Sequence, residues 1–316
     1  MAGDHEDGTK DMVNTRILQQ GLRPRSGEVE PAVPAEVAPR ALRHDPILQG
    51  RVSNPRASGQ RRGAAVGQTM PRNPAVQAEL ADLRAGLPQI ADSLEIAAQQ
   101  CGRVPAFDRT TATGMALDQL RSQLLRVTGE KGWRRLGIAA PRREAGSSFI
   151  TLGLTASIAR LDYLRLVMID MDLSRPSLHT HLGLAAPGPL EELLAAGLPA
   201  IELVHRIGAG LAVVLNDTPV TAASELLYSP DTIARLRELD EALKPDMTLL
   251  DLPPLLSDPA AQAGLAQVDA VLLVADGTET TARDVNECER LLRDQVPLLG
   301  VVLNKSEDGA AQGRRN

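Results

Sequence analysis

Short apolar runs alternate with amphipathic stretches from Leu136 onward. The apolar runs have the length of strands, and the stretches between them carry hydrophobic residues at helical spacing. In chain order the segments are LGIAA, FITLGLTASIARL, LVMID, PLEELLAA, LAVVL, SELLYSPDTIARLRELDEAL, MTLLDL, VDAVLLVAD, ARDVNECERLLRD and LLGVVLN. Strands that alternate with helices predict an α/β fold, a doubly wound and mostly parallel sheet with helices on both faces.

Two further helical patterns precede this region. Between Asn73 and Gln100 the apolar residues recur at helical spacing, and Asn73-Pro74 is a helix-start signal, so we expect a helix that Pro88 can interrupt. The segment from Met115 to Val127 predicts a second amphipathic helix, which we expect to pack against the α/β domain. Residues 1–72 are rich in Pro, Gly and Arg, a composition typical of disorder.

These patterns divide the chain into four parts. We expect a disordered tail over 1–72, a helical lead-in over 73–132, a P-loop-type domain over 133–308 and a short C-terminal tail over 309–316.

Composition and charge narrow the class of protein. Of the 316 residues 43% are hydrophobic but only 2% are aromatic, so the core must consist of Leu, Val, Ile and Ala, which suits buried parallel strands. The formal net charge of -6 gives no basic field, and we expect no nucleic-acid partner. The two cysteines have no paired spacing, and the N-terminal sequence lacks the features of a secretory signal. We therefore expect a cytoplasmic protein that reaches the inner membrane only through a partner.

A candidate phosphate-binding loop follows the first predicted strand. The segment APRREAGSSF joins the strand LGIAA to a helix, a geometry that offers backbone N–H groups and a positive helix end to an anion. A complete P-loop also has a lysine for the β- and γ-phosphates and a hydroxyl for magnesium. Gly146 and Ser148 match that pattern, whereas Ser147 stands where the lysine is expected.

Carboxylates follow two other predicted strands. LVMID ends in Asp170, with Asp172 two residues later and Arg175 beyond it, and TLLDLPP places Asp251 after another buried run. Because ligands in doubly wound sheets bind beyond the carboxyl ends of the strands, we expect these acids to lie beside the loop. Such carboxylates can coordinate magnesium or accept a proton from a hydroxyl nucleophile.

Together these segments resemble the bacterial tyrosine kinases of capsule and exopolysaccharide assembly, within the wider group of MinD- and ParA-like ATPases. The resemblance runs from about Met115 to Lys305 and is carried by LRSQLL, APRREAGSSF, IDMDLSRPSLHTHLGL, ELLYSP, LLDLPPLLSDPAA, VDAVLLVADGTETT and LLGVVLNK. It implies ATP and Mg²⁺ as cofactors and a membrane-bound polysaccharide co-polymerase, or chain-length determinant, as partner. It also implies a homo-oligomer.

The resemblance assigns roles residue by residue. It implies that the catalytic acids are Asp170, Asp172 and Asp251, with Asp172 as the base. The metal would be held by Ser148, Asp170 and Asp251. The remaining nucleotide-binding positions, with Asn304 at the adenine, would be Arg142, Arg143, Gly146, Ser147, Ser148, Arg175 and Asn304.

The sequence departs from the family pattern in three places. Glu144, Ala145 and Ser147 replace the usual Gly, Glu and Lys of the loop. The C-terminal segment NKSEDGAAQGRRN carries no tyrosine cluster. In the arginine-bearing oligomerisation helix, Arg121 matches but Asp118 replaces another arginine. Because guanidinium binds phosphate well, Arg142 or Arg143 could supply the lost cation; the alternative is that both are solvated loop residues.

Three functions therefore compete. The first is a kinase-like regulatory protein of exopolysaccharide synthesis and export whose ATP chemistry is weakened or lost. The second is an active, autophosphorylating protein tyrosine kinase, and the third is a MinD- or ParA-like positioning ATPase. Two smaller features have structural interpretations: His179 and His181 as ordinary helix or loop residues rather than metal ligands, and Asp258 either near the site or capping the next helix.

Overall fold

The computed structural model describes residues 74–100, 108–185, 188, 190–191, 199–208 and 210–305. The predicted N-terminal tail over 1–72, the C-terminal tail over 309–316 and most of the segment PLEELLAA lie outside the described residues.

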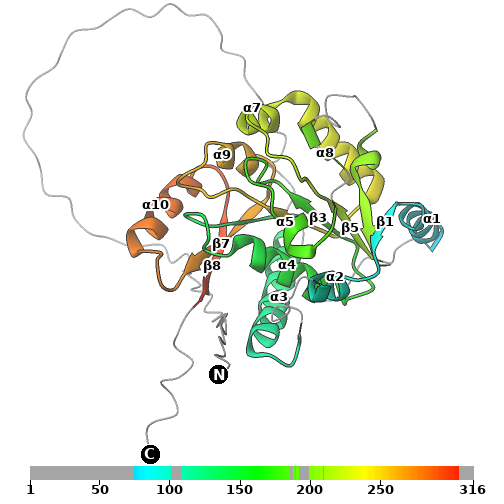
Figure 1. Cartoon of the computed structure of the whole chain (residues 1–316), viewed down its shortest axis with the longest axis horizontal. Coiled ribbons are helices and arrows are strands. Elements are labelled where there is room, and N and C mark those ends of the chain that lie inside the picture. Colours follow the sequence, from blue (N-terminus) through cyan, green and yellow to red (C-terminus); the bar gives the residue numbers. More distant parts are fainter. Residues whose placement is uncertain are drawn as a thin grey trace, which may run out of the picture. The chain divides into compact units, whose positions relative to one another are not determined.

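An eight-stranded sheet forms the centre of the described domain (Figure 1). Its strands, in chain order, are β1 (Gln89–Ala91), β2 (Arg135–Ala139), β3 (Leu166–Asp170), β4 (His205–Ile207), β5 (Leu211–Val214), β6 (Met247–Asp251), β7 (Ala270–Asp276) and β8 (Leu298–Asn304). The spatial order is β1-β4-β5-β3-β6-β2-β7-β8, and every neighbouring pair is parallel except β4 and β5. The predicted doubly wound, mostly parallel sheet is confirmed.

Helices cover both faces of this sheet. One face carries α2 (Leu94–Gln100), α3 (Ala112–Lys131), α4 (Ser147–Ala159) and α5 (Leu178–Leu182). The other carries η1 (Ala200–Leu203), α7 (Ala223–Tyr228), α8 (Pro230–Leu243), α9 (Ala260–Leu265) and α10 (Ala282–Leu292). In Figure 1, α3 and α4 lie below the strands and α8 and α9 above them.

Each face of the sheet has its own hydrophobic core, and successive strand residues point alternately into one core and the other, as the pleat of a strand requires. Met168 of β3 packs with α3 and α4, while its neighbours Val167 and Ile169 pack on the opposite face. All three are buried, which explains why the central strands read as continuous apolar runs rather than alternating ones.

The lead-in segment differs in part from the helical expectation. Helix α1 (Pro74–Ala85) ends before Pro88, and residues Gln89–Ala91 form β1, which pairs with β4. The interruption expected near Pro88 is therefore present, and the helical pattern resumes as α2 (Leu94–Gln100). The strand β1 was not predicted, because three residues are too few to produce an alternating pattern. The helix predicted over Met115–Val127 is confirmed as α3, which Thr111 caps and Gly132 ends in a left-handed conformation.

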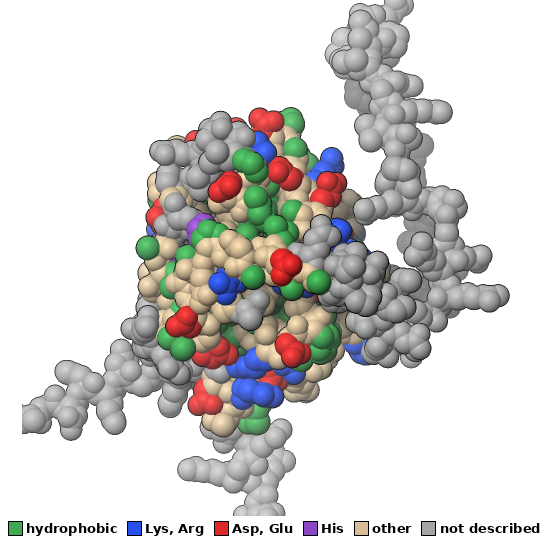
Figure 2. Space-filling model, turned by 90° about the vertical axis from the view of Figure 1, so that its right-hand side faces the viewer, with side chains coloured by type: hydrophobic (Ala, Val, Ile, Leu, Met, Phe, Trp, Pro, Cys, Tyr) green, Lys and Arg blue, Asp and Glu red, His purple; other side chains and the backbone are tan. Residues whose placement is uncertain are grey.

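Acidic, basic and apolar side chains are interspersed over the face drawn in Figure 2, with a group of Lys and Arg side chains at its lower edge. Within the part of the chain that the structure describes, no helix combines the length and the apolar character needed to cross a membrane.

Candidate phosphate-binding site

The carboxyl ends of several strands converge on the loop between β2 and α4. Asp170 ends β3 and lies in register with Asp251, which ends β6 beside it. β6 in turn pairs with β2, whose chain continues into the loop. The predicted acids and the predicted loop therefore meet at one edge of the sheet.

The loop ends at a helix N-terminus that no side chain caps. Gly146 occupies the N-cap position with φ of 95°, and the first backbone hydrogen bond of α4 runs from the Ile150 N–H to the Gly146 carbonyl. The N–H groups of the first turn have no partner within the helix and carry the positive end of its dipole. They face a cavity of about 330 Å³ lined by Arg142, Arg143, Glu144, Gly146, Ser147, Ser148, Phe149, Asp172, Arg175, Ser177, His181 and Pro254.

Glu144 has a left-handed backbone at the position where the sequence resemblance implies a glycine. Its φ is 67°, which costs a residue with a Cβ roughly 1–2 kcal/mol. The end of β8 holds the carbonyl groups of this part of the loop. The Asn304 amide donates to the Ala145 carbonyl (3.0 Å), and the Lys305 ammonium donates to the Glu144 carbonyl (2.8 Å) and to the Asp276 carboxylate (2.9 Å).

Lys305 was not predicted to belong to the site. A bond from an ammonium group to a backbone carbonyl 161 positions away leaves no local sequence pattern. The available signal was its place directly after Asn304, at the end of a strand next to β7. Asn304 was expected at the adenine, and the structure places its amide nitrogen on the loop.

Asp170 and Asp251 are fully buried and incompletely paired. Asp170 accepts hydrogen bonds from the N–H groups of Ser177 and Leu178 at 3.2 Å each, while its Oδ1 has no partner. Burial, together with the nearby charge of Asp251, raises the pKa of Asp170 well above its ordinary value.

Asp251 receives hydroxyl donors from the first turns of α4. Thr151 Oγ1 donates to it at 3.0 Å, Ser148 also hydrogen-bonds to it, and its Oδ2 has no partner. Burial raises the pKa of Asp251 to about 7, although both hydroxyl groups oppose the shift. Ser148 also accepts a hydrogen bond from the Ser177 hydroxyl at 3.2 Å, so it lies between the end of β6 and the start of α5.

Arg143 bridges two carboxylates at the wall of the cavity. Its Nη1 donates to Asp172 Oδ2 at 2.9 Å, and its Nη2 donates to Asp258 Oδ2 at 2.7 Å. Burial raises the pKa of Asp172, and the Arg143 charge opposes that rise. Asp258 therefore lies near the site, as one of its two sequence interpretations expects. It also accepts the Ala260 N–H at the start of α9, although the N-cap position of that helix is Pro259.

The two loop arginines have different environments. Arg142 lies on the cavity rim, but its guanidinium donates to Asp284 of α10 at 2.9 Å, and 65% of its side chain is exposed. Asp284 belongs to the capping box of α10, so this bond ties the loop to a neighbouring helix. Arg175 is exposed, and its N–H donates to Asp172 at 3.3 Å.

His179 and His181 both lie on α5, and the His181 ring contacts the Ser177 carbonyl at 2.7 Å. Among the residues that the structure describes, no group of three or more His, Cys, Asp or Glu side chains is arranged to hold a metal ion by itself. A metal at this edge would therefore need hydroxyl, phosphate or water oxygens as well.

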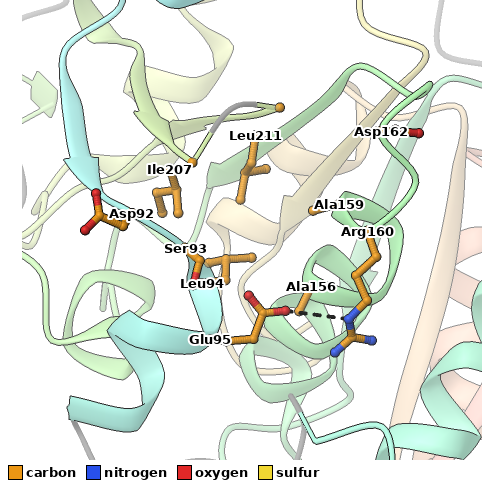
Figure 3. Close-up of a pocket in the computed structure, with 12 residues that line it drawn as sticks. Asp92, Ser93, Leu94, Glu95, Ala156, Ala159, Arg160, Asp162, Ile207 and Leu211 are labelled. Atoms are coloured by element: carbon orange, nitrogen blue, oxygen red, sulfur yellow. Dashed lines mark ion pairs between the residues drawn. The ribbon is translucent and has the colours of Figure 1, made fainter.

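A second cavity of about 320 Å³ lies at the opposite edge of the sheet (Figure 3). Leu211 at the start of β5 and Ala159 at the end of α4 contribute to its wall. Glu95 and Arg160 form an ion pair there at 3.6 Å. None of the residues predicted for the nucleotide site lines this cavity.

Several known proteins are similar to this chain in sequence or in fold. No family model matches the chain. It is 30% identical over 193 residues to the putative tyrosine-protein kinase EpsB of Ralstonia solanacearum, covering 60% of this chain and 25% of that protein. It is 33% identical over 149 residues to the tyrosine-protein kinase ptk of Acinetobacter johnsonii, covering 46% and 18%. The chain thus spans about a quarter of the length of such relatives.

A solved structure agrees with these relatives. The kinase domain of the Escherichia coli tyrosine kinase ETK superposes with a TM-score of 0.59 at 27% identity, covering 65% of this chain and 81% of that one. In sequence and in fold, the described domain is therefore similar to bacterial tyrosine kinase domains of the P-loop ATPase type.

Proposed function

We propose that this chain is a kinase-like regulatory protein of exopolysaccharide or capsule synthesis and export, in which ATP chemistry is weakened. One observation carries the proposal. The loop has Ser147 in place of the cationic lysine, and Arg143, which lines the cavity, is bound to Asp172 and Asp258. The expected base is thus paired with a guanidinium group that would otherwise be available to phosphate.

The remaining groups fit a magnesium nucleotide. Uncapped N–H groups at the start of α4 suit phosphate oxygens, and Ser148 offers a hydroxyl oxygen beside the acids. Asp170 and Asp251 each keep one buried oxygen without a partner, and Mg²⁺ prefers oxygen ligands. When bound, Mg²⁺ would neutralise charge on the β- and γ-phosphates. Ser148 and these two acids would hold it, directly or through water.

The absence of the lysine predicts how far nucleotide affinity and the rate of phosphoryl transfer are reduced. A hydrogen bond from a charged donor contributes about 1.5–3 kcal/mol, which corresponds to roughly 10- to 100-fold in nucleotide affinity. Removal of one preorganised donor to a developing charge commonly lowers the rate about 10²- to 10³-fold. Binding thus survives better than phosphoryl transfer, which favours a regulatory role over a catalytic one.

The proposed partner is a membrane-bound polysaccharide co-polymerase, or chain-length determinant, that brings this cytoplasmic protein to the inner membrane. The proposal rests on the similarity to the curated tyrosine-protein kinases named above, of whose length this chain covers a quarter or less: 25% for EpsB and 18% for ptk. A homo-oligomer would have to form without a free Arg121. The guanidinium of that residue is bound within the domain to Asp118 and to the Ser157 carbonyl at 3.0 and 2.9 Å.

The second candidate is an active tyrosine kinase, and the position of Arg143 favours it. Arg143 lines the same cavity as Ser147 and Ser148, so release from its carboxylates would place a cation beside the phosphates. Acceptor tyrosines within this chain are restricted to Tyr163 and Tyr228, both exposed by more than half.

Phosphotyrosine detection after co-expression with a co-polymerase from the same gene neighbourhood separates the two candidates. The regulatory proposal predicts no signal above that of Asp172→Ala, and a gain of signal in Ser147→Lys. A signal from the unmodified chain that Asp172→Ala and Arg143→Ala both abolish would establish the active kinase instead.

The gene neighbourhood tests both candidates together. Neighbouring genes for chromosome partitioning or septum placement, in place of glycosyltransferases and an exporter, would overturn the regulatory and the active-kinase proposals alike.

A further inference from the structure

Two residues with left-handed backbones, far apart in sequence, are joined at the phosphate loop. Glu144 has φ of 67° and Lys305 has φ of 54°, and the Lys305 ammonium donates to the Glu144 carbonyl at 2.8 Å. Residues with a Cβ rarely adopt this conformation, and their presence in a ligand-binding loop requires support from the surroundings.

The support comes from a short polar anchor. Asp276 ends β7 and pairs in register with Asn304 at the end of β8. Its carboxylate is 4% exposed and accepts the Lys305 ammonium at 2.9 Å. The Asp276 Oδ1 accepts the N–H and hydroxyl of Thr278, which fixes the carboxylate. Lys305 therefore extends from a rigid strand end to the loop.

Asn304 and Lys305 hold consecutive carbonyl groups of the loop. Asn304 binds the Ala145 carbonyl, and Lys305 binds the Glu144 carbonyl. With both carbonyls directed toward the end of β8, the Gly146 N–H and the first N–H groups of α4 are left for an anion. A peptide flip at Glu144 would instead present a carbonyl oxygen to the same space, and a carbonyl repels phosphate.

We infer that Lys305 is a positioning residue of this site, which holds the Glu144 carbonyl so that the loop keeps its anion-binding conformation without the usual glycine. It acts on the loop backbone rather than on the ligand, because it is bound to Glu144 and Asp276 and does not line the cavity. The inference rests on the proposed nucleotide binding only for its effect on affinity.

The first test measures the loop without ligand. Hydrogen exchange of the full chain should show amides of residues 144–150 exchanging at least about 10-fold faster in Lys305→Met than in the unmodified protein. Glu144→Gly in the Lys305→Met background should restore protection, because glycine adopts positive φ without strain. Lys244→Met is the matched control, since Lys244 also has positive φ (42°) but caps α8. Unchanged loop exchange in Lys305→Met would overturn the inference.

The second test measures the affinity for magnesium–ATP by calorimetry. Lys305→Met should weaken binding about 10-fold, whereas Lys305→Arg, Lys244→Met and the Lys305→Met/Glu144→Gly double variant should bind within about 3-fold of the unmodified chain. Equal affinity in Lys305→Met would contradict the inference. If the unmodified chain binds no magnesium–ATP, the proposed nucleotide binding is contradicted. The exchange experiment would still decide the role of Lys305.

Discussion

The Arg143 guanidinium donates to the Asp172 carboxylate across 2.9 Å and thereby joins the phosphate loop to the residue expected to act as base. Its second amino group binds Asp258 at 2.7 Å. One cation thus serves two carboxylates whose side chains are only 14% and 8% exposed.

Arg143→Ala should lower the free energy of unfolding by about 1–3 kcal/mol, because two mostly buried carboxylates lose their charged donor. Chemical denaturation at neutral pH measures the change. Arg142→Ala is the control, since Arg142 is 65% exposed and its ion pair should contribute less than about 1 kcal/mol. Equal losses in both variants would show that the Arg143 bridge contributes no more to the free energy of unfolding than the exposed ion pair of Arg142.

The pH dependence of stability should report the buried Asp251. Its folded-state pKa of about 7 lies above the ordinary value of 3.8, so its contribution to stability is fully present below pH 3.8 and is lost as the pH rises toward 7. Asp251→Asn is neutral throughout and can still accept the Thr151 hydroxyl. The variant should gain stability relative to the unmodified chain between pH 5 and pH 8. Parallel stability curves over that range would contradict the burial of an unpaired charge.

Gly146→Ala should destabilise the domain by more than Gly132→Ala. Both glycines have positive φ, but a Cβ at Gly146 would collide with the Asn304 amide, whereas nothing lies within 4 Å of one at Gly132. Left-handed strain alone costs about 1–2 kcal/mol in each variant, and the collision adds about 1–3 kcal/mol at Gly146. Urea unfolding of the two variants compares them directly, and a larger loss in Gly132→Ala would contradict the loop geometry.

The sequence predicted those features that repeat or that follow strands. Buried apolar runs predicted the central sheet, and acids directly after two of those runs predicted that Asp170 and Asp251 would lie together, as their register confirms. The edge strand β1 was missed because three residues produce no period. The partners of the charged residues were also missed: Arg142 and Arg143 are adjacent in sequence, yet the first binds α10 and the second the carboxylates of the site.

Calorimetric titration with magnesium–ATP, comparing the unmodified chain with Ser147→Lys, tests the central claim most directly. The missing lysine predicts that Ser147→Lys binds about 10- to 100-fold more tightly than the unmodified chain. Equal, tight binding by both proteins would contradict the claim that this loop has lost its phosphate-binding cation.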